Sequence, residues 1–174
     1  MIARRKLILS GAAAVLAAIL SRRAGAADDP TAILTAIYTR VTKGKGDGGG
    51  TFVIENKAAR AKYLSHALAT LWAKADARTR KGDGGPVGFD PVTNSQDPDV
   101  KSFKVAAEKQ AADKATMAVT IEAHQREVRA NAADKTIRYE FVLEGSQWKI
   151  NDIKGAVDGS PWSVRALLVD SFKY

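Results

Sequence analysis

The chain has 174 residues, of which 45% are hydrophobic and 26% charged, and its formal net charge is +8. This composition is that of one globular domain with a sizeable core, and it excludes a disordered or fibrous chain. The absence of cysteine excludes disulfides, a thiol nucleophile and a lipid-modified cysteine.

Residues 1–26 predict a cleaved export signal. A basic start at 4–6 precedes an apolar run over 7–20, which is shorter than the roughly 20 residues that a membrane-spanning helix needs. Small residues then favour cleavage between Ala26 and Ala27. We therefore expect a periplasmic protein that has no stable membrane anchor after cleavage, with residues 27–174 as a single domain.

The basic charge of the chain belongs mostly to this signal. Its first two arginines, Arg4 and Arg5, resemble a twin-arginine signal, and an ordinary secretory signal is the alternative. Without residues 1–26 the chain has 22 Lys and Arg against 19 Asp and Glu, a net charge of +3. No basic stripe with interleaved aromatics is left, so we expect no nucleic-acid partner.

Helical spacing of apolar residues predicts two helices in the first part of the mature chain. Asp29 and Pro30 are typical of a helix start, and a second helix is predicted over 57–81. Both segments run into a KGDGG stretch, where glycine favours the end of a helix. The predicted stripes are Ile33, Leu34, Ile37, Tyr38 and Val41 for the first helix, and Tyr63, Leu64, Ala67, Leu68, Leu71, Trp72 and Ala75 for the second.

Beyond residue 100 the apolar period changes from 3.6 to 2, which predicts four strands joined by short loops. Short connections indicate an antiparallel meander. Ser160 and Pro161 predict the cap of a short C-terminal helix. Together these elements predict an α+β fold, with two N-terminal helices on a curved sheet of about four strands. The inward positions are Phe103, Val105 and Ala107; Met117, Val119 and Ile121; Ile137, Tyr139, Phe141 and Leu143; and Trp148 and Ile150.

This order of elements resembles the nuclear transport factor 2-like fold, in particular a family of small exported bacterial proteins of unknown function. The resemblance lies in Ile37-Tyr38, in the Phe89-Asp90-Pro91 to Gln96-Asp97 segment and in the WKINDI stretch at 148–153. It covers most of the mature chain. It implies a cone whose sheet and helices surround a pocket, and fold likeness alone does not settle what such a pocket does.

Three aspartates are candidate acid–base groups. Asp90 and Asp97 lie in FDPVTNSQDPD, where Asp before Pro typically starts a turn. Alternatively they line the mouth of the cone, where a partly desolvated carboxylate can transfer a proton. A third interpretation is a calcium loop with oxygens from Asp90, Asn94, Asp97 and Asp99, although the spacing departs from the helix–loop–helix calcium pattern. Asp152 faces inward if strict alternation holds from Trp148. We favour a strand bulge, which would leave it exposed or salt-bridged.

A pocket lined by aromatic side chains with a few polar groups is typical of a small-molecule site. The candidate ligand-binding residues are Tyr38, Asp90, Gln96, Asp97, Tyr139 and Trp148. His66 and His124 lie far apart in a chain without cysteine, so we expect no metal site. The sequence has no nucleophile-elbow or phosphate-loop motif, and we expect no cofactor.

We therefore expect a non-catalytic module, monomeric or homodimeric, that binds a small molecule or an envelope protein. One alternative is an acid–base enzyme of the isomerase or hydrolase type that uses Asp152, Asp90 or Asp97, with Tyr139 as partner. The other alternative is an inhibitor or immunity-type protein that binds another envelope protein.

Overall fold

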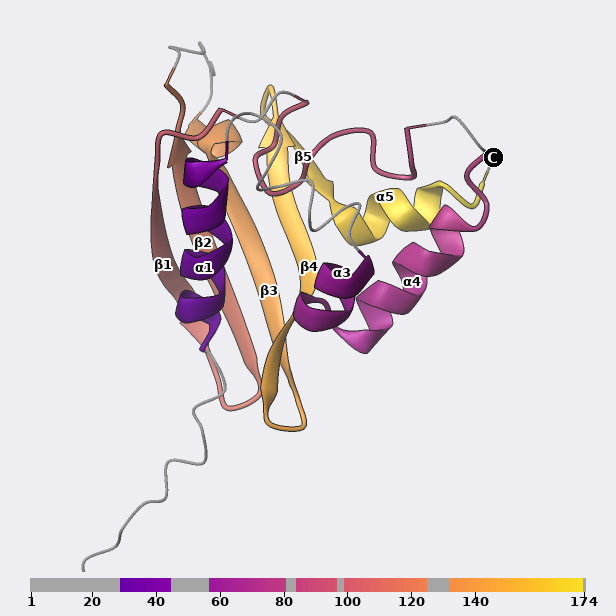
Figure 1. Ribbon diagram of the computed structural model, residues 1–174, viewed down its shortest axis with the longest axis horizontal. Coiled ribbons are helices and arrows are strands. Elements are labelled where there is room, and N and C mark those ends of the chain that lie inside the picture. Colours follow the sequence, from indigo (N-terminus) through magenta and orange to yellow (C-terminus); the bar gives the residue numbers. More distant parts are fainter. Residues whose placement is uncertain (1–28, 45–56, 81–83, 97–98, 125–131, 174) are drawn as a thin grey trace, which may run out of the picture.

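The computed structural model describes residues 29–44, 57–80, 84–96, 99–124 and 132–173. Within them the chain has the predicted α+β fold, in which helices pack on an open antiparallel sheet of order β1-β2-β3-β4-β5 (Figure 1). Each strand pairs with the next along the chain, so the sheet is a meander. The elements are α1 (Pro30–Lys43), α3 (Lys57–Tyr63), α4 (His66–Asp76), β1 (Ser102–Gln110), β2 (Lys114–Glu122), the 3-10 turn η1 (Ala132–Lys135), β3 (Thr136–Glu144), β4 (Gln147–Val157), β5 (Ser160–Ser163) and α5 (Val164–Asp170).

Helix α1 begins where the sequence predicts. The Asp29 side chain accepts a hydrogen bond from the backbone N–H of Ala32 at 2.7 Å, and Pro30 occupies the first turn. Figure 1 shows α1 lying along one face of the sheet, beside β1 and β2. The whole predicted stripe is buried, so Tyr38 points toward the sheet.

The single helix predicted over 57–81 is wrong, because the chain forms two helices, α3 and α4. The backbone N–H of Ser65 donates to the carbonyl oxygen of Ile150 in β4, at 2.8 Å, and this ends α3. The Ser65 hydroxyl accepts from the N–H of Leu68 at 3.0 Å and caps α4. Ala67, placed in the predicted stripe, is exposed. The apolar spacing continues across the break, so periodicity could not detect it.

The four predicted strands are confirmed as β1 to β4. Alternate residues of β2 and β3 are buried, including Met117, Val119, Tyr139 and Phe141. In β1 the pairing shifts register after Ala107, whose side chain is exposed rather than inward as predicted. Ala107 keeps the register of Phe103 and Val105 and pairs with buried Met117, so its exposure comes from its place near the end of the edge strand and not from the bulge that follows it.

The segment after β4 differs from the prediction. Residues 160–163 form a fifth strand, β5, paired antiparallel with the end of β4, where the sequence predicted a helix cap. Asp158 and Gly159 have positive φ values of 51° and 77°, and this tight turn reverses the chain. Helix α5 is capped instead by Ser163, at the end of the new strand.

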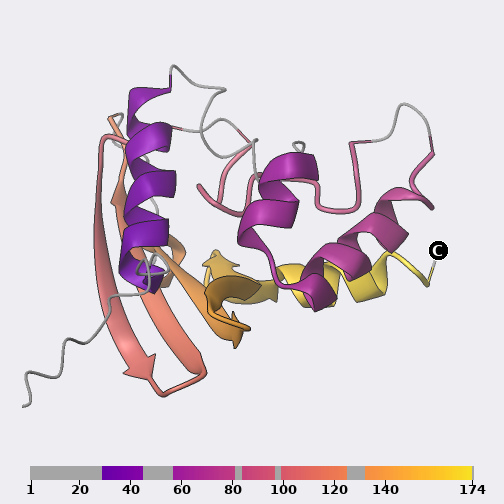
Figure 2. The same ribbon diagram turned by 60° about the horizontal axis from the view of Figure 1, so that its bottom comes forward.

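The core lies between the inner face of the sheet and the helices. Figure 2 shows α1 beside β1 and β2, with α3, α4 and α5 grouped toward the β4–β5 end. The largest fully buried side chains are Trp72 from α4, Tyr38 from α1, and Tyr139 and Phe141 from β3. Within the described ranges, none of the helices has the length and apolar character needed to cross a membrane.

Candidate functional site

The FDPVTNSQ stretch forms a tight, buried turn. Asp90 and Ser95 pair through their backbones, and the Asp90 carboxylate accepts hydrogen bonds from the Val92 N–H at 2.9 Å and the Thr93 hydroxyl at 2.8 Å. Asp90 is 5% exposed. Its two oxygens therefore hold the turn together, which is the turn-starting role that Asp before Pro predicts.

Asn94 joins this turn to two other parts of the chain. It has a left-handed φ of 54°, and its amide donates to the carbonyl oxygens of Asp134 at 3.1 Å and Ala156 at 2.7 Å. Its side-chain oxygen accepts from the indole N–H of Trp162 at 2.9 Å. The Trp162 ring lies over Gly155 so closely that an added Cβ there would come within 2.5 Å of it. The turn is therefore anchored to both η1 and the β4–β5 hairpin.

Two predicted ligand-binding tyrosines meet beneath this turn. The Tyr38 hydroxyl donates to the Val92 carbonyl oxygen at 2.7 Å and lies 3.0 Å from the Tyr139 hydroxyl. Both side chains are 0% exposed. Burial, together with the negative charge of nearby Asp90, raises the pKa of each phenol, so both remain protonated. The pair is a closed polar cluster within the core.

Burial also raises the pKa of the Asp90 carboxyl above its ordinary value of 3.8, although hydrogen bonds from Thr93 and Val92 act in the opposite direction. Native Asp90 thus holds its proton more tightly than unfolded Asp90. The stability that this proton contributes is present below pH 3.8 and is lost as the pH rises through the native pKa.

Replacing Asp90 with asparagine should therefore make the protein more stable than the wild type at neutral pH. The amide keeps an acceptor for Val92 and a group able to bond Thr93, but it carries no buried charge. The difference in free energy of unfolding should shrink as the pH falls toward about 3. Chemical denaturation of both proteins across that range measures it. A constant difference at every pH would contradict the raised pKa.

The predicted bulge in β4 is present, and of the two outcomes predicted for Asp152, exposed or salt-bridged, the structure shows an ion pair with Lys154 at a buried position. Phe141 pairs with Ile150 and Glu140 pairs with Asp152, which leaves Asn151 as the extra residue. The bulge turns Asp152 to the sheet face opposite Ile150, but β5 and the start of α5 cover it there, and it is 4% exposed.

The Asp152 carboxylate is fully engaged in this position. One oxygen accepts from the backbone N–H groups of Ile153 at 2.9 Å and Arg165 at 3.0 Å. The other accepts from the Ser163 hydroxyl at 2.7 Å, and the Lys154 ammonium lies 4.0 Å from it. Asp152 thus joins β4 to the first turn of α5.

The other predicted site residues lie apart from the tyrosine pair. Gln96 is exposed, and Trp148 is half-buried in β4, where it pairs with Leu143 near the turn after β3. Asp97 and the predicted cleavage point at Ala26 and Ala27 lie outside the described residues. The structure therefore brings together Tyr38, Asp90 and Tyr139, but not Gln96 or Trp148.

The two histidines form no site together. Nδ1 of His124 lies 2.6 Å from a carboxylate oxygen of Asp99 at the surface, and the backbone N–H of His66 donates to the Glu144 carboxylate. Within the described part of the chain, no group of three or more His, Cys, Asp or Glu side chains is placed to hold a metal ion.

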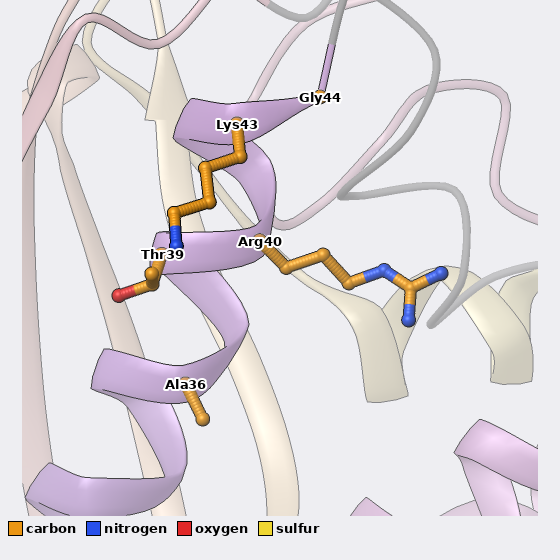
Figure 3. Close-up of a pocket in the computed structure, with 5 residues that line it drawn as sticks. All are labelled: Ala36, Thr39, Arg40, Lys43 and Gly44. Atoms are coloured by element: carbon orange, nitrogen blue, oxygen red, sulfur yellow. The ribbon is translucent and has the colours of Figure 1, made fainter.

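Hollows occur on the outer surfaces of the helices. One of about 470 Å³ lies at the end of α1, and Figure 3 shows Lys43 folded back toward Thr39 while Arg40 extends away from it. The cationic ends of these side chains therefore do not converge on one point. A second hollow, of about 400 Å³, lies between α4 and α5 and is lined by His66, Ala67, Thr70, Leu71, Lys74, Arg165 and Val169.

A third hollow, of about 380 Å³, lies between α3 and α4. Lys57, Arg60 and Asp76 supply its charged groups, and its other lining residues are Ala61, Ala69, Ala73 and Ala77. Arg60 forms an ion pair with Asp76, and its guanidinium carbon lies 4.8 Å from the ring centroid of Trp72. The Arg60 side chain is only 11% exposed.

Two buried donors where α3 packs against α4 have no partner among the described residues. Among the residues that the structure describes, Nε of Arg60 and Nε1 of Trp72 are the buried side-chain nitrogens that have no hydrogen-bond partner. Buried polar groups are nearly always hydrogen-bonded, and the exceptions commonly mark a bound water, an ion or a functional site. The hollow between α3 and α4 is therefore the candidate functional site.

Sequence reasoning missed this site. Arg60 and Asp76 lie 16 residues apart within one predicted helix, and only the break at Ser65 folds them together. One signal was available: Ala69, Ala73 and Ala77 recur every fourth residue and predict a face of small side chains on α4.

Comparisons of the chain with protein-family models, with curated proteins and with solved structures found no match. The resemblance to the nuclear transport factor 2-like fold thus remains a prediction. The candidate site rests on the contacts of the chain's own residues.

Proposed function

We propose that this protein is an exported, non-catalytic module that binds a small ligand in the hollow between α3 and α4. The observation that carries the proposal is the hollow itself, where Lys57, Arg60 and Asp76 place charged groups beside walls of alanine side chains.

The form of the hollow agrees with ligand binding. Its volume of about 380 Å³ lies within the roughly 300–1,000 Å³ typical of small-molecule sites. Its walls are mostly apolar, and the few polar groups come from Lys57, Arg60 and Asp76. Such a lining is typical of sites that bind an apolar body and orient it through a small number of polar contacts.

The alternative of an acid–base enzyme has less support. Both oxygens of Asp90 and both oxygens of Asp152 already accept hydrogen bonds from neighbouring groups. The Tyr139 hydroxyl, the proposed partner, is buried against Tyr38. A general base must come within hydrogen-bond reach of a substrate, and these groups lie in the packed interior.

In this proposal the protein acts in the periplasm, which it reaches through the signal at residues 1–26. The proposal also takes the fold to be nuclear transport factor 2-like. The proposed ligand site lies on the outer side of two helices rather than within a cone. Co-purification of another protein, instead of a small ligand, would support the alternative function of an inhibitor that binds another envelope protein.

Native mass spectrometry of the mature chain, starting at Ala27 and purified from the periplasm, tests the proposal. We expect an additional small mass that disappears when the sample is denatured. Ala73→Leu should abolish the additional mass, because the larger side chain fills the hollow. Ala36→Leu, at an exposed position of α1, should keep the additional mass. Alanine and leucine are both strong helix formers, so the melting temperatures should stay close to that of the wild type. A bare wild-type mass would contradict tight ligand binding.

A further inference from the structure

We infer that the groove between α4 and α5 is a docking surface for an acidic amphipathic helix of a partner protein. This groove is the hollow of about 400 Å³ between these two helices, and none of its lining residues lines the proposed ligand site. The inference is carried by the length of the groove, by the apolar side chains at its base and by the cations at its two ends.

Helices α4 and α5 run side by side in the same direction (Figure 1, Figure 2). At their starts, the Ser65 hydroxyl and the Arg165 guanidinium both lie within hydrogen-bond distance of the Asn151 side-chain oxygen. At their ends, the guanidinium carbon of Arg78 lies 4.7 Å from the ring centroid of Phe172. The groove between the two helices is therefore elongated along their common direction.

The length of the groove matches a short helix. Its lining residues on α4 extend from His66 to Lys74, a distance of about 12 Å along the helix axis. On α5 the lining residues Arg165 and Val169 lie one turn apart. About two turns of a partner helix fit along this groove.

Apolar side chains at the base of the groove are open to solvent. Ala67 is exposed, Leu71 is half-buried, and Val169 is 46% exposed, which is unusual for a large hydrophobic residue in this fold. Apolar surface that is rimmed by polar groups is typical of interaction sites. Because this base is open rather than enclosed, it suits the apolar side of a helix.

The rim of the groove has positive charge that the described residues do not neutralise. Neither Lys74 nor Arg165 forms an ion pair within that part of the chain. Arg165 donates to Asn151 through Nε and Nη2, whereas its Nη1 has no partner among the described residues and is not closed to solvent. The bonds to Asn151 also fix the guanidinium, so little rotamer freedom is lost when a partner binds.

The nearby carboxylates have other partners. Glu144 accepts from the first backbone N–H of α4, at His66, and Asp170 forms an ion pair with Lys173. Among the described residues that line the groove, none is Asp or Glu. A partner that supplies carboxylates therefore complements the groove electrostatically.

The positions of the two cations favour a helix over other occupants. Arg165 lies at the start of α4, beside Ser65, and Lys74 lies two turns further along. On one face of a helix, residues seven apart are separated by about 10.5 Å, so two carboxylates with apolar residues between them can reach both cations. One fatty-acid headgroup reaches only one of them. A second copy of the same face would bring like charges together.

Isothermal titration with two blocked helical peptides of about 15 residues tests the inference. The acidic peptide has leucines along one face and two glutamates seven residues apart beside them, and the control peptide has glutamine at both positions. The acidic peptide should bind at least about tenfold more tightly than the control, because the cations of the groove face its carboxylates. The difference should shrink at high salt.

Charge reversal at Lys74 locates the binding surface. Lys74→Glu should weaken binding of the acidic peptide about tenfold or more, and changing one of the two peptide glutamates to lysine should restore it. This rescue shows that the variant is folded. Lys109→Glu, the same change of charge at an exposed position of β1, should leave peptide binding unchanged.

Three results would overturn the inference: no binding of the acidic peptide, equal affinity for both peptides, or binding that Lys74→Glu does not change. Binding of phosphatidylglycerol vesicles that depends on Lys74, without peptide binding, would assign the groove to a membrane surface instead. Self-association that Val169→Ser removes, again without peptide binding, would assign it to a second copy of the chain.

This docking surface and the proposed ligand site can fail separately. Ala73→Leu, which fills the hollow between α3 and α4, should remove the bound small mass but leave peptide binding unchanged. Lys74→Glu should do the reverse.

Discussion

Replacing Asp152 with alanine should lower the free energy of unfolding by about 3–5 kcal/mol, the cost typical of removing one partner from a buried charged network. The substitution leaves the backbone N–H groups of Ile153 and Arg165 and the hydroxyl of Ser163 without the acceptor that they share. Each buried donor left unsatisfied costs about 1–3 kcal/mol. The first turn of α5 would also lose one of its attachments to β4, while the hydrogen bonds from Arg165 to Asn151 remain.

Chemical denaturation with circular dichroism measures this effect. Asp170→Ala is a matched control, since Asp170 is an exposed carboxylate at the end of α5 that forms an ion pair with nearby Lys173. It should change stability by less than about 1 kcal/mol, as exposed ion pairs do. Asp152→Asn should fall between the two, because it keeps one acceptor oxygen. If Asp152→Ala were as stable as the control, a structural role for this carboxylate would be ruled out and the acid–base interpretation would regain support.

Replacing Asn94 with alanine should cost about 2–4 kcal/mol, because it removes three hydrogen bonds from a partly buried junction. The lost partners are the carbonyl oxygens of Asp134 and Ala156 and the indole N–H of Trp162. Alanine also tolerates the φ of 54° at this position less well than asparagine does. The turn at 89–95 would then be released from η1 and from the β4–β5 hairpin.

Asn94→Gly separates these two causes. Glycine adopts a positive φ without strain but cannot make the three hydrogen bonds. If the hydrogen bonds dominate, the glycine variant should be destabilised nearly as much as the alanine variant, as judged by denaturant midpoint. The Trp162 indole N–H should also become more accessible to hydrogen exchange. Full stability of the glycine variant would show that the backbone conformation alone matters here.

Local signals in the sequence were enough to predict several elements. Helix α1 has its cap, its proline and its apolar stripe within 13 consecutive residues, 29–41, so nothing distant is needed to specify it. Strands β2 and β3 bury alternate residues, with Ala118 as an additional buried residue in β2, because one face of each packs on the core. The order of helices followed by strands then indicated the α+β class.

No local signal in the sequence links the break between α3 and α4 to the bulge in β4. Ser65 donates its backbone N–H to Ile150, and its hydroxyl lies 3.0 Å from the side-chain oxygen of Asn151, the bulged residue. Arg165 donates to the carbonyl oxygen and to the side-chain oxygen of Asn151. The irregular backbone of β4 and the end of α3 thus satisfy each other's hydrogen bonds across 86 residues of sequence.

By itself, the sequence determined the fold class, the position of α1, the four long strands and the turn at Asp90, because these depend on spacing and on neighbouring residues. The tertiary structure alone decided the burial of Asp152, the fifth strand, and the meeting of Arg60, Asp76 and Trp72 beside a hollow. These features depend on contacts between distant segments. The free energy of burying a polar group depends on the partners that those contacts supply, and no local sequence pattern specifies them.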